Sequence, residues 1–306
     1  MSVSRARAIS ERRFAWLSEP LPEVAISFEF FPPKTADAED RLWTAIERLA
    51  LFHPNYVSVT CGAGGNPAEG TAALVDGLRE RAGLQAAAHL TCATAPCAIV
   101  DGVAERYWAK GIRHLVALRG DPPKDAAPRL NGAHYGFAAD LVSALRRIGD
   151  FEISVAAYPE PHPEAASAEA DFANLKRKID AGATRAITQY CFDTDAVLRL
   201  RDRMVAAGIR APLAVGILPV HNFTQVRRFS ERCGAGVPDW LGALFDGLDN
   251  DPEQQALVAA CVAAEQARRL IVEGIKELHF YTLNRAELTI AACRLLGLRP
   301  ALPCAA

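Results

Sequence analysis

A carboxylate that could do chemistry, Glu29, lies near the end of an apolar run closed by two prolines, Ile26-Ser27-Phe28-Glu29-Phe30-Phe31-Pro32-Pro33-Lys34. Side chains of a β-strand alternate between its faces, so Ser27 and Glu29 are expected on the face opposite Ile26, Phe28 and Phe30. A buried carboxylate without a partner is costly, so Glu29 should be either paired or used. An ion pair with Lys34 or an arginine is the alternative, and position alone leaves both open.

A second polar group ends another apolar run, Ala117-Leu118-Arg119-Gly120-Asp121-Pro122-Pro123. It places a fixed cation, a flexible backbone and an anion together at the end of a strand. The alternative is a surface pair between Arg119 and Asp121 that caps a turn, which contributes little energy.

A third group, Asp171, Asn174, Arg177 and Lys178, has helical spacing. These positions are neighbours on one helix face. That face would suit a pyrophosphate or a ribose, although a solvated helix surface would have the same pattern.

The elements that must position these groups repeat one unit, a short β-branched or aromatic run followed by a turn and a longer amphipathic stretch. Eight such strands are predicted, at 24–30, 56–60, 85–91, 113–118, 153–158, 185–191, 213–218 and 277–281. Strands that alternate with helices in this number predict an α/β fold, the (β/α)₈ or TIM barrel. Extra helices at 222–233 and 251–272, separated by a loop over 234–251, are expected between strands 7 and 8.

No linker divides the chain, which predicts a single barrel domain over 21–300, an N-terminal extension over 1–20 and a short tail over 301–306. The active site of such a barrel lies where its strands end. Polar residues follow nearly every predicted strand there, among them Thr60, His89, Thr91, Tyr158, His162, Gln189, Asn284 and Arg285.

Composition and missing motifs exclude several classes of function. A formal net charge of -2 over 306 residues, without a basic stripe, argues against a nucleic-acid partner. No stretch is apolar enough for a membrane span, no signal peptide is convincing, and the scattered cysteines suggest reduced thiols, so a cytoplasmic protein is expected. Gly62-Ala63-Gly64-Gly65 fails the dinucleotide fingerprint because Pro67 stands at its third glycine, and the histidines form no metal-binding array.

Five ordered motifs give the chain a close resemblance to the methylenetetrahydrofolate reductases from about residue 20 to residue 300. They are Ser27-Phe28-Glu29-Phe30-Phe31-Pro32-Pro33, Ala117-Leu118-Arg119-Gly120-Asp121, Ala156-Ala157-Tyr158-Pro159-Glu160, Asn174-Leu175-Lys176-Arg177-Lys178 and Phe280-Tyr281-Thr282-Leu283-Asn284-Arg285. The resemblance is to the short bacterial form, which implies that the regulatory domain of eukaryotic relatives and control by S-adenosylmethionine are absent. Homo-oligomers are also implied, since relatives often form them.

The resemblance implies a barrel that binds FAD and passes hydride from NADH or NADPH, in ping-pong fashion, to 5,10-methylenetetrahydrofolate. The product, 5-methyltetrahydrofolate, supplies methyl groups for methionine synthesis. Opening the imidazolidine ring requires a general acid at N10, and Glu29 is the candidate. Asp121 is expected near the pterin and the flavin pyrimidine, where its charge would stabilise the iminium cation and lower the flavin potential.

Matched by position, the resemblance implies a set of FAD contacts and a smaller set for folate and nicotinamide. The FAD set is Thr60, Ala63, His89, Arg119, Gly120, Asp121, Tyr135, Tyr158, His162, Asp171, Asn174, Arg177 and Lys178. The folate and nicotinamide set is Gln189, Gln225 and Arg285, with Phe229 as a stacking partner. Cys61 departs from the family, whose members carry an aromatic residue there, and no metal is expected.

Three other functions stay open at this point. A pterin-binding methyltransferase would share the barrel and the folate contacts but lack FAD, and a proline dehydrogenase-like flavin barrel would lack the folate set. A barrel that serves only as a subunit or binding module would have no reason to keep Glu29, Asp121 and Gln189 together. A flavin spectrum that bleaches with NADH and recovers with methylenetetrahydrofolate would separate these alternatives.

Overall fold

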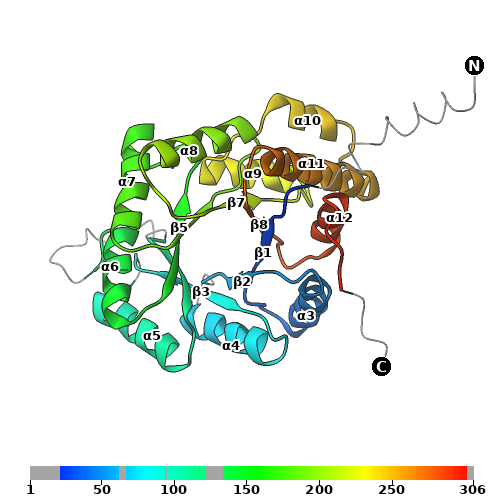
Figure 1. Cartoon of the computed structure of the whole chain (residues 1–306). Coiled ribbons are helices and arrows are strands. Elements are labelled where there is room, and N and C mark those ends of the chain that lie inside the picture. Colours follow the sequence, from blue (N-terminus) through cyan, green and yellow to red (C-terminus); the bar gives the residue numbers. More distant parts are fainter. Residues whose placement is uncertain (1–20, 62–66, 94, 121–133, 302–306) are drawn as a thin grey trace, which may run out of the picture.

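A closed barrel of parallel strands forms the centre of the molecule (Figure 1). The computed structural model describes residues 21–61, 67–93, 95–120 and 134–301. The strands pair in sequence order and β8 closes on β1, which confirms the predicted TIM barrel. They are β1 (Ala25–Phe30), β2 (Tyr56–Val59), β3 (Ala86–Thr91), β4 (His114–Leu118), β5 (Glu152–Ala157), β6 (Arg185–Thr188), β7 (Leu213–Ile217) and β8 (Glu277–Tyr281).

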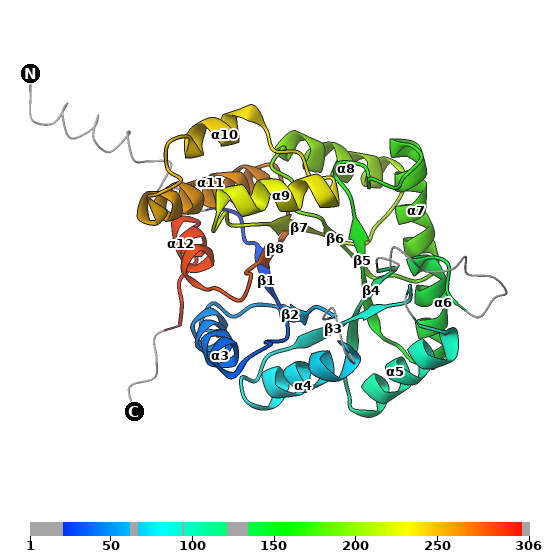
Figure 2. The same cartoon turned by 180° about the vertical axis from the view of Figure 1, so that it is seen from behind.

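Helices surround the barrel, as both views show (Figures 1 and 2). They are α3 (Ala36–Ala50), α4 (Pro67–Glu80), α5 (Cys97–Ala109), α6 (Ala138–Ile148), α7 (Ala168–Asp180), α8 (Thr194–Ala206), α9 (Phe223–Cys233), α10 (Asp239–Phe245), α11 (Pro252–Val272) and α12 (Glu287–Leu295). Within the described part of the chain, no helix combines the length and hydropathy needed to cross a membrane.

The extra helices between β7 and β8 begin at residues whose side chains bind free backbone N–H groups. Asn222 accepts a hydrogen bond from the Gln225 backbone at the start of α9, and Asp251 accepts one from Gln254 at the start of α11. Both helices lie where the sequence predicts them, but the predicted loop between them contains α10. The loop prediction was wrong for α10. Glycine, proline and aspartate in 234–251 are typical of a loop, but a short helix forms there and buries Leu241 and Phe245.

Side chains along each strand point alternately outward, into the core between strands and helices, and inward, into the interior of the barrel. In β1, Ile26, Phe28 and Phe30 pack outward in the main core between strands and helices, while Ser27 and Glu29 point inward. A small second cluster of Tyr56, Ala87, Val116, Ile187 and Ala214 fills the middle of the barrel. The face assignment made for Glu29 is therefore confirmed, because the interior is the only volume that the other face can reach.

Charged side chains close the end of the barrel where the strands begin. The Arg185 guanidinium lies 2.8 Å from a Glu277 carboxylate oxygen, also pairs with Glu152, and lies 5.0 Å from the Tyr56 ring centre. Burial opposes the charge of Arg185, but the two carboxylates outweigh it and raise its pKa. This charged floor leaves the opposite end of the interior open for a ligand.

A close approach between β6, β7 and β8 requires a glycine at residue 216. A Cβ atom there would lie 2.5 Å from the Thr188 carbonyl oxygen and 2.6 Å from Tyr281 Cε2. The same glycine donates its N–H to Thr188 Oγ1 at 2.9 Å, so β7 cannot shift without losing this bond.

We predict that Gly216→Ala lowers the free energy of unfolding by about 1 to 3 kcal/mol, as overpacking of a rigid site does. Urea unfolding followed by circular dichroism measures the change. Gly242→Ala is the matched control, because its nearest neighbour outside the helix, Phe223 Cζ, would be 3.9 Å away. Equal effects of the two substitutions would contradict the assigned close approach.

Candidate active site

A pocket of about 520 Å³ occupies the end of the barrel where the strands finish. We call it the barrel pocket, and most of its lining residues are the last inward-facing residues of their strands or the first residues beyond them. They are Glu29, Phe31, Thr60, Cys61, His89, Thr91, Val116, Leu118, Ala156, Tyr158, Ile187, Gln189, Tyr190, Leu218, Phe229, Tyr281 and Leu283. Polar residues predicted at the strand ends therefore line a common pocket.

Glu29 faces two buried histidines. Its Oε2 lies 3.5 Å from His89 Nε2 and 3.7 Å from His279 Nε2, distances longer than a hydrogen bond. Neither ring nitrogen has a hydrogen-bond partner among the described residues. Among the described residues, the expected alternative of an ion pair with Lys34 or an arginine is not found, because the inward face of β1 carries Glu29 towards histidines of β3 and β8.

The pairing of β1 with β8 fixes the position of Glu29. Ser27 pairs in register with His279, and Ser27 Oγ lies 2.7 Å from His279 Nδ1. Thr282 Oγ1 donates to the Glu29 carbonyl at 2.6 Å, while the Asn284 side chain bonds both backbone groups of Phe31. The acid candidate is therefore held by backbone bonds on a rigid strand, and its carboxylate has only the two histidines as basic neighbours among the described residues.

Burial sets the charge of His89. Desolvation lowers the pKa of this imidazole to about 4, although the Glu29 carboxylate acts in the opposite direction. His89 is consequently neutral at physiological pH. Depending on its tautomer, a neutral ring either donates or accepts one hydrogen bond at Nε2, so His89 could bond a ligand next to Glu29 in either way.

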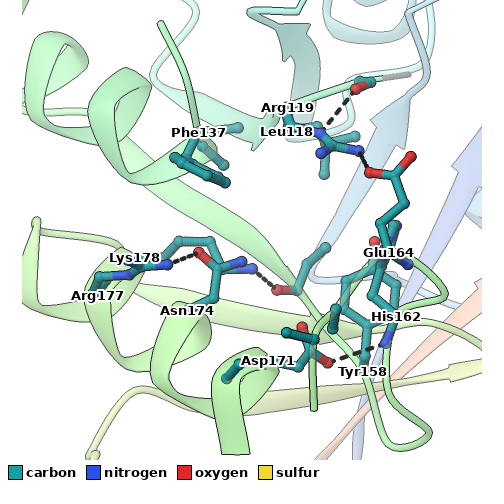
Figure 3. Close-up of a pocket in the computed structure, with 17 residues that line it drawn as sticks. Leu118, Arg119, Phe137, Tyr158, His162, Glu164, Asp171, Asn174, Arg177 and Lys178 are labelled. Atoms are coloured by element: carbon teal, nitrogen blue, oxygen red, sulfur yellow. Dashed lines mark hydrogen bonds and ion pairs between the residues drawn. The ribbon is translucent and has the colours of Figure 1, made fainter. Parts of the chain in front are cut away.

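A second pocket, of about 420 Å³, opens beside the first between the ends of β4 and β5 and helix α7 (Figure 3). We call it the rim pocket. It is lined by Ala117, Leu118, Arg119, Gly120, Phe137, Ala138, Ala156, Tyr158, His162, Glu164, Ala165, Ala166, Ala170, Asp171, Asn174, Arg177 and Lys178. Leu118, Ala156 and Tyr158 line both pockets, so the two form one elongated site.

Helix α7 provides the charged wall of the rim pocket. Lys178 is 3 % exposed, and its amine donates to the Ala156 carbonyl at 2.5 Å. Burial lowers its pKa to about 8, against the opposing effect of Asp171. Arg177 reaches Asn174 Oδ1 at 3.2 Å, and its guanidinium lies 5.6 Å from the Phe137 ring. The solvated-face alternative fails for Lys178, which is buried with its charge facing a cavity.

Arg119 pairs with Glu164 over the same pocket. Its Nη2 lies 2.5 Å from Glu164 Oε2, and this hydrogen bond holds the pKa of Glu164 below its usual range. Asp121, the partner suggested by sequence, lies outside the described residues, as does Ala63. Gly120 has φ +76°, and a Cβ atom there would meet Thr91 at 3.0 Å, so glycine is required at this turn.

Most of the predicted contacts gather in these two pockets. Three do not line either one: Tyr135, whose hydroxyl donates to Asp101 at 2.7 Å, and Gln225 and Arg285, which are exposed. Sequence reasoning missed His279, Tyr281, Tyr190 and Phe137. The alternation of β8 could have identified the first two, since Glu277, His279 and Tyr281 share one face. Over the described ranges, no three His, Cys, Asp or Glu side chains are arranged to hold a metal ion.

Comparison with known proteins identifies the family. A family model described as methylenetetrahydrofolate reductase matches residues 19–297. The chain belongs to this family. It is 51 % identical over 284 residues to the 5,10-methylenetetrahydrofolate reductase of Pectobacterium carotovorum, covering 93 % of this chain and 94 % of that one. It is 49 % identical over 287 residues to the Escherichia coli enzyme of the same name, covering 94 % and 95 %.

These similarities make the protein an enzyme of the methylenetetrahydrofolate reductase type, similar in length to bacterial members of the family. A Zea mays relative, methylenetetrahydrofolate reductase (NADH) 1, is 34 % identical over 90 % of this chain, but only 48 % of that protein is covered. Among solved structures, a Clostridium thermocellum protein described as binding two copies of 5-methyl-5,6,7,8-tetrahydrofolic acid shares the fold. Its TM-score is 0.57 at 14 % identity, over 93 % of this chain and 97 % of that one.

We predict that His89 stays neutral down to about pH 5 and that Glu29→Gln lowers its pKa further, because the carboxylate now raises it. Nitrogen chemical shifts of the imidazole, followed by NMR titration, measure both. His114 is the internal control: its pKa is also about 4, but Glu152 raises it and Glu29 does not contribute. A His89 pKa unchanged by Glu29→Gln would show that the two side chains do not interact.

Proposed function

We propose that the protein reduces 5,10-methylenetetrahydrofolate to 5-methyltetrahydrofolate with FAD and a reduced nicotinamide, and so supplies methyl groups for methionine synthesis. Family membership supports the overall reaction. The observation that carries the assignment is Glu29 in the wall of the barrel pocket, facing two buried imidazole nitrogens that have no hydrogen-bond partner among the described residues.

The elongated site fits a dinucleotide. Phosphates need cations and close backbone, which Arg177, the buried amine of Lys178 and Gly120 offer in the rim pocket. A flat ring system would extend past Leu118 and Tyr158 into the barrel pocket. When bound, FAD would accept hydride from the nicotinamide and deliver it to the folate.

The protein's own part in the reaction is acid catalysis and charge stabilisation. Glu29 protonates N10 of the folate, the bond from N10 to the bridging carbon breaks, and an iminium cation forms at N5. Hydride addition to that carbon completes the methyl group. Gln189 and Phe229, at the same pocket, hold the substrate, and the charge of Asp121 stabilises the cation.

We predict that Glu29→Gln keeps FAD and accepts hydride from NADH at nearly the wild-type rate, but reduces methylenetetrahydrofolate roughly 100- to 10,000-fold more slowly, as loss of a general acid does. Stopped-flow absorbance of the flavin follows each half-reaction separately. Glu23→Gln, an exposed carboxylate before β1, is the control and should leave both rates unchanged. Equal losses in both half-reactions would refute a folate-specific acid.

We predict that Arg177→Ala with Lys178→Ala releases FAD on dilution from a folded barrel, since charged hydrogen bonds to a diphosphate contribute roughly 1.5 to 3 kcal/mol each. Flavin fluorescence after gel filtration measures retention, and circular dichroism confirms folding. In the wild type, FAD affinity should fall above about pH 8, where free Lys178 loses its proton.

Lys176→Ala is the matched control for this pair. Lys176 lies on the same helix but bonds Asp180 at 2.7 Å and does not line the rim pocket. The control should retain FAD as the wild type does. Full retention by the double variant would move the phosphate site elsewhere on the rim.

A further inference from the structure

Helix α9 carries Phe229, which lines the barrel pocket, but few of its side chains anchor it in the protein. Figure 2 shows α9 at one end of the barrel, nearer to the viewer than α11. The structure describes the whole helix, and Val226 and Ser230 are its buried residues. Phe229 itself is 47 % exposed. The position of the Phe229 ring at the pocket therefore depends on the contacts that hold the two ends of α9.

The two ends of α9 are held in different ways. Near the N-terminal end, the Phe223 ring stacks on Phe245 of α10, with ring centres 4.8 Å apart and an angle of 4° between the planes. Near the C-terminal end, the Tyr190 hydroxyl oxygen lies 2.9 Å from Ser230 Oγ and 3.2 Å from Cys233 Sγ. One hydroxyl group of the loop after β6 thus forms hydrogen bonds with two residues in the last turn of α9.

The Tyr190 ring belongs to the wall of the same pocket. It is nearly parallel to the Phe229 ring, at 19° with 6.1 Å between the centres, and steeply inclined to the Tyr281 ring, at 76° and 6.3 Å. The Tyr281 hydroxyl in turn donates to the Thr188 carbonyl, at the end of β6, at 2.7 Å. Tyr190, which is buried, therefore connects the strand ends to α9.

The hydroxyl of Tyr190 is required neither for packing nor for acid catalysis. A phenylalanine ring would pack against Phe229 and Tyr281 in the same way. Burial and the bond to Cys233 raise the pKa of the Tyr190 hydroxyl well above its usual range, so the group keeps its proton. Its two hydrogen-bond partners among the described residues both lie on α9. What the hydroxyl adds is therefore a link to that helix.

We propose that Tyr190 is a positioning residue, whose hydroxyl holds the last turn of α9 so that Phe229 is in place before the substrate binds. The inference rests on the proposed function for the identity of the substrate, a folate that stacks on Phe229. A preformed wall lowers KM, because binding then does not have to order α9. The β1–β8 pairing holds Glu29, so the chemistry there does not depend on Tyr190. Loss of the hydroxyl should therefore raise KM for methylenetetrahydrofolate and leave kcat nearly unchanged.

The test makes two measurements on Tyr190→Phe in the FAD-loaded full-length protein. Amide hydrogen exchange, followed by mass spectrometry without substrate, should become about three- to tenfold faster over residues 229–233. Steady-state kinetics with NADH as donor should show a KM for methylenetetrahydrofolate about three- to tenfold higher, with kcat within about twofold of the wild type. Ser230→Ala should cause the same changes. In the double variant the two effects should not add, because the hydroxyl that Ser230 bonds is already absent.

Tyr107→Phe is the matched control, because it removes the hydroxyl of an equally buried tyrosine on α5 that lines neither pocket. It should keep the wild-type exchange rates in α9 and the wild-type KM. Unchanged exchange in Tyr190→Phe would overturn the proposal, as would an unchanged KM or a fall in kcat without a rise in KM. Exchange needs no substrate. A wild type that fails to reduce methylenetetrahydrofolate would therefore reject the proposed function, and exchange would still decide the role of Tyr190.

Discussion

The seam where β1 pairs with β8 is the contact on which both the barrel and its active site depend. Ser27 and His279, about 250 positions apart in sequence, meet there in register, and their side chains are 2.7 Å apart. The same pairing sets Glu29 between two imidazoles, while Thr282 and Asn284 tie the end of β1 to the loop after β8. The pairing that closes the sheet also forms the acid site, because the inward-facing side chains of the barrel strands are brought together in one small interior.

In the rim pocket, unlike at the β1–β8 seam, a charged side chain is buried with few partners inside the protein. The amine of Lys178 is buried beside a cavity and has one carbonyl acceptor, with Asp171 as its opposing charge. Burial therefore disfavours the charged form of this lysine. Such a group makes physical sense if an anionic ligand completes its coordination. The two parts of the site thus differ in construction: backbone bonds on strands fix Glu29, whereas the cationic wall on α7 depends on the ligand that we propose for it.

Sequence patterns predicted the strands well because alternation and turn residues are local properties. β1 and β8 match within one residue at each end, and the helical spacing of Asp171, Asn174, Arg177 and Lys178 does place them around one pocket. Strand β6 ends at Thr188, earlier than expected, and α10 was missed. Both errors arise where tertiary packing overrides local signals: Tyr190 is buried beyond the strand end, and α10 is held by Leu241 and Phe245.

The sequence by itself determined the eight-strand order, the inward face of Glu29, the polar character of the strand ends and, through its motifs, the family. Tertiary structure alone decided what surrounds those groups. The two histidine partners of Glu29, the bond of Lys178 to Ala156, the pairing of Arg119 with Glu164, and the continuity of the two pockets all join residues on separate elements. Side-chain periodicity is a property of a single strand or helix, whereas a contact between elements depends on barrel closure and register, which no local pattern encodes.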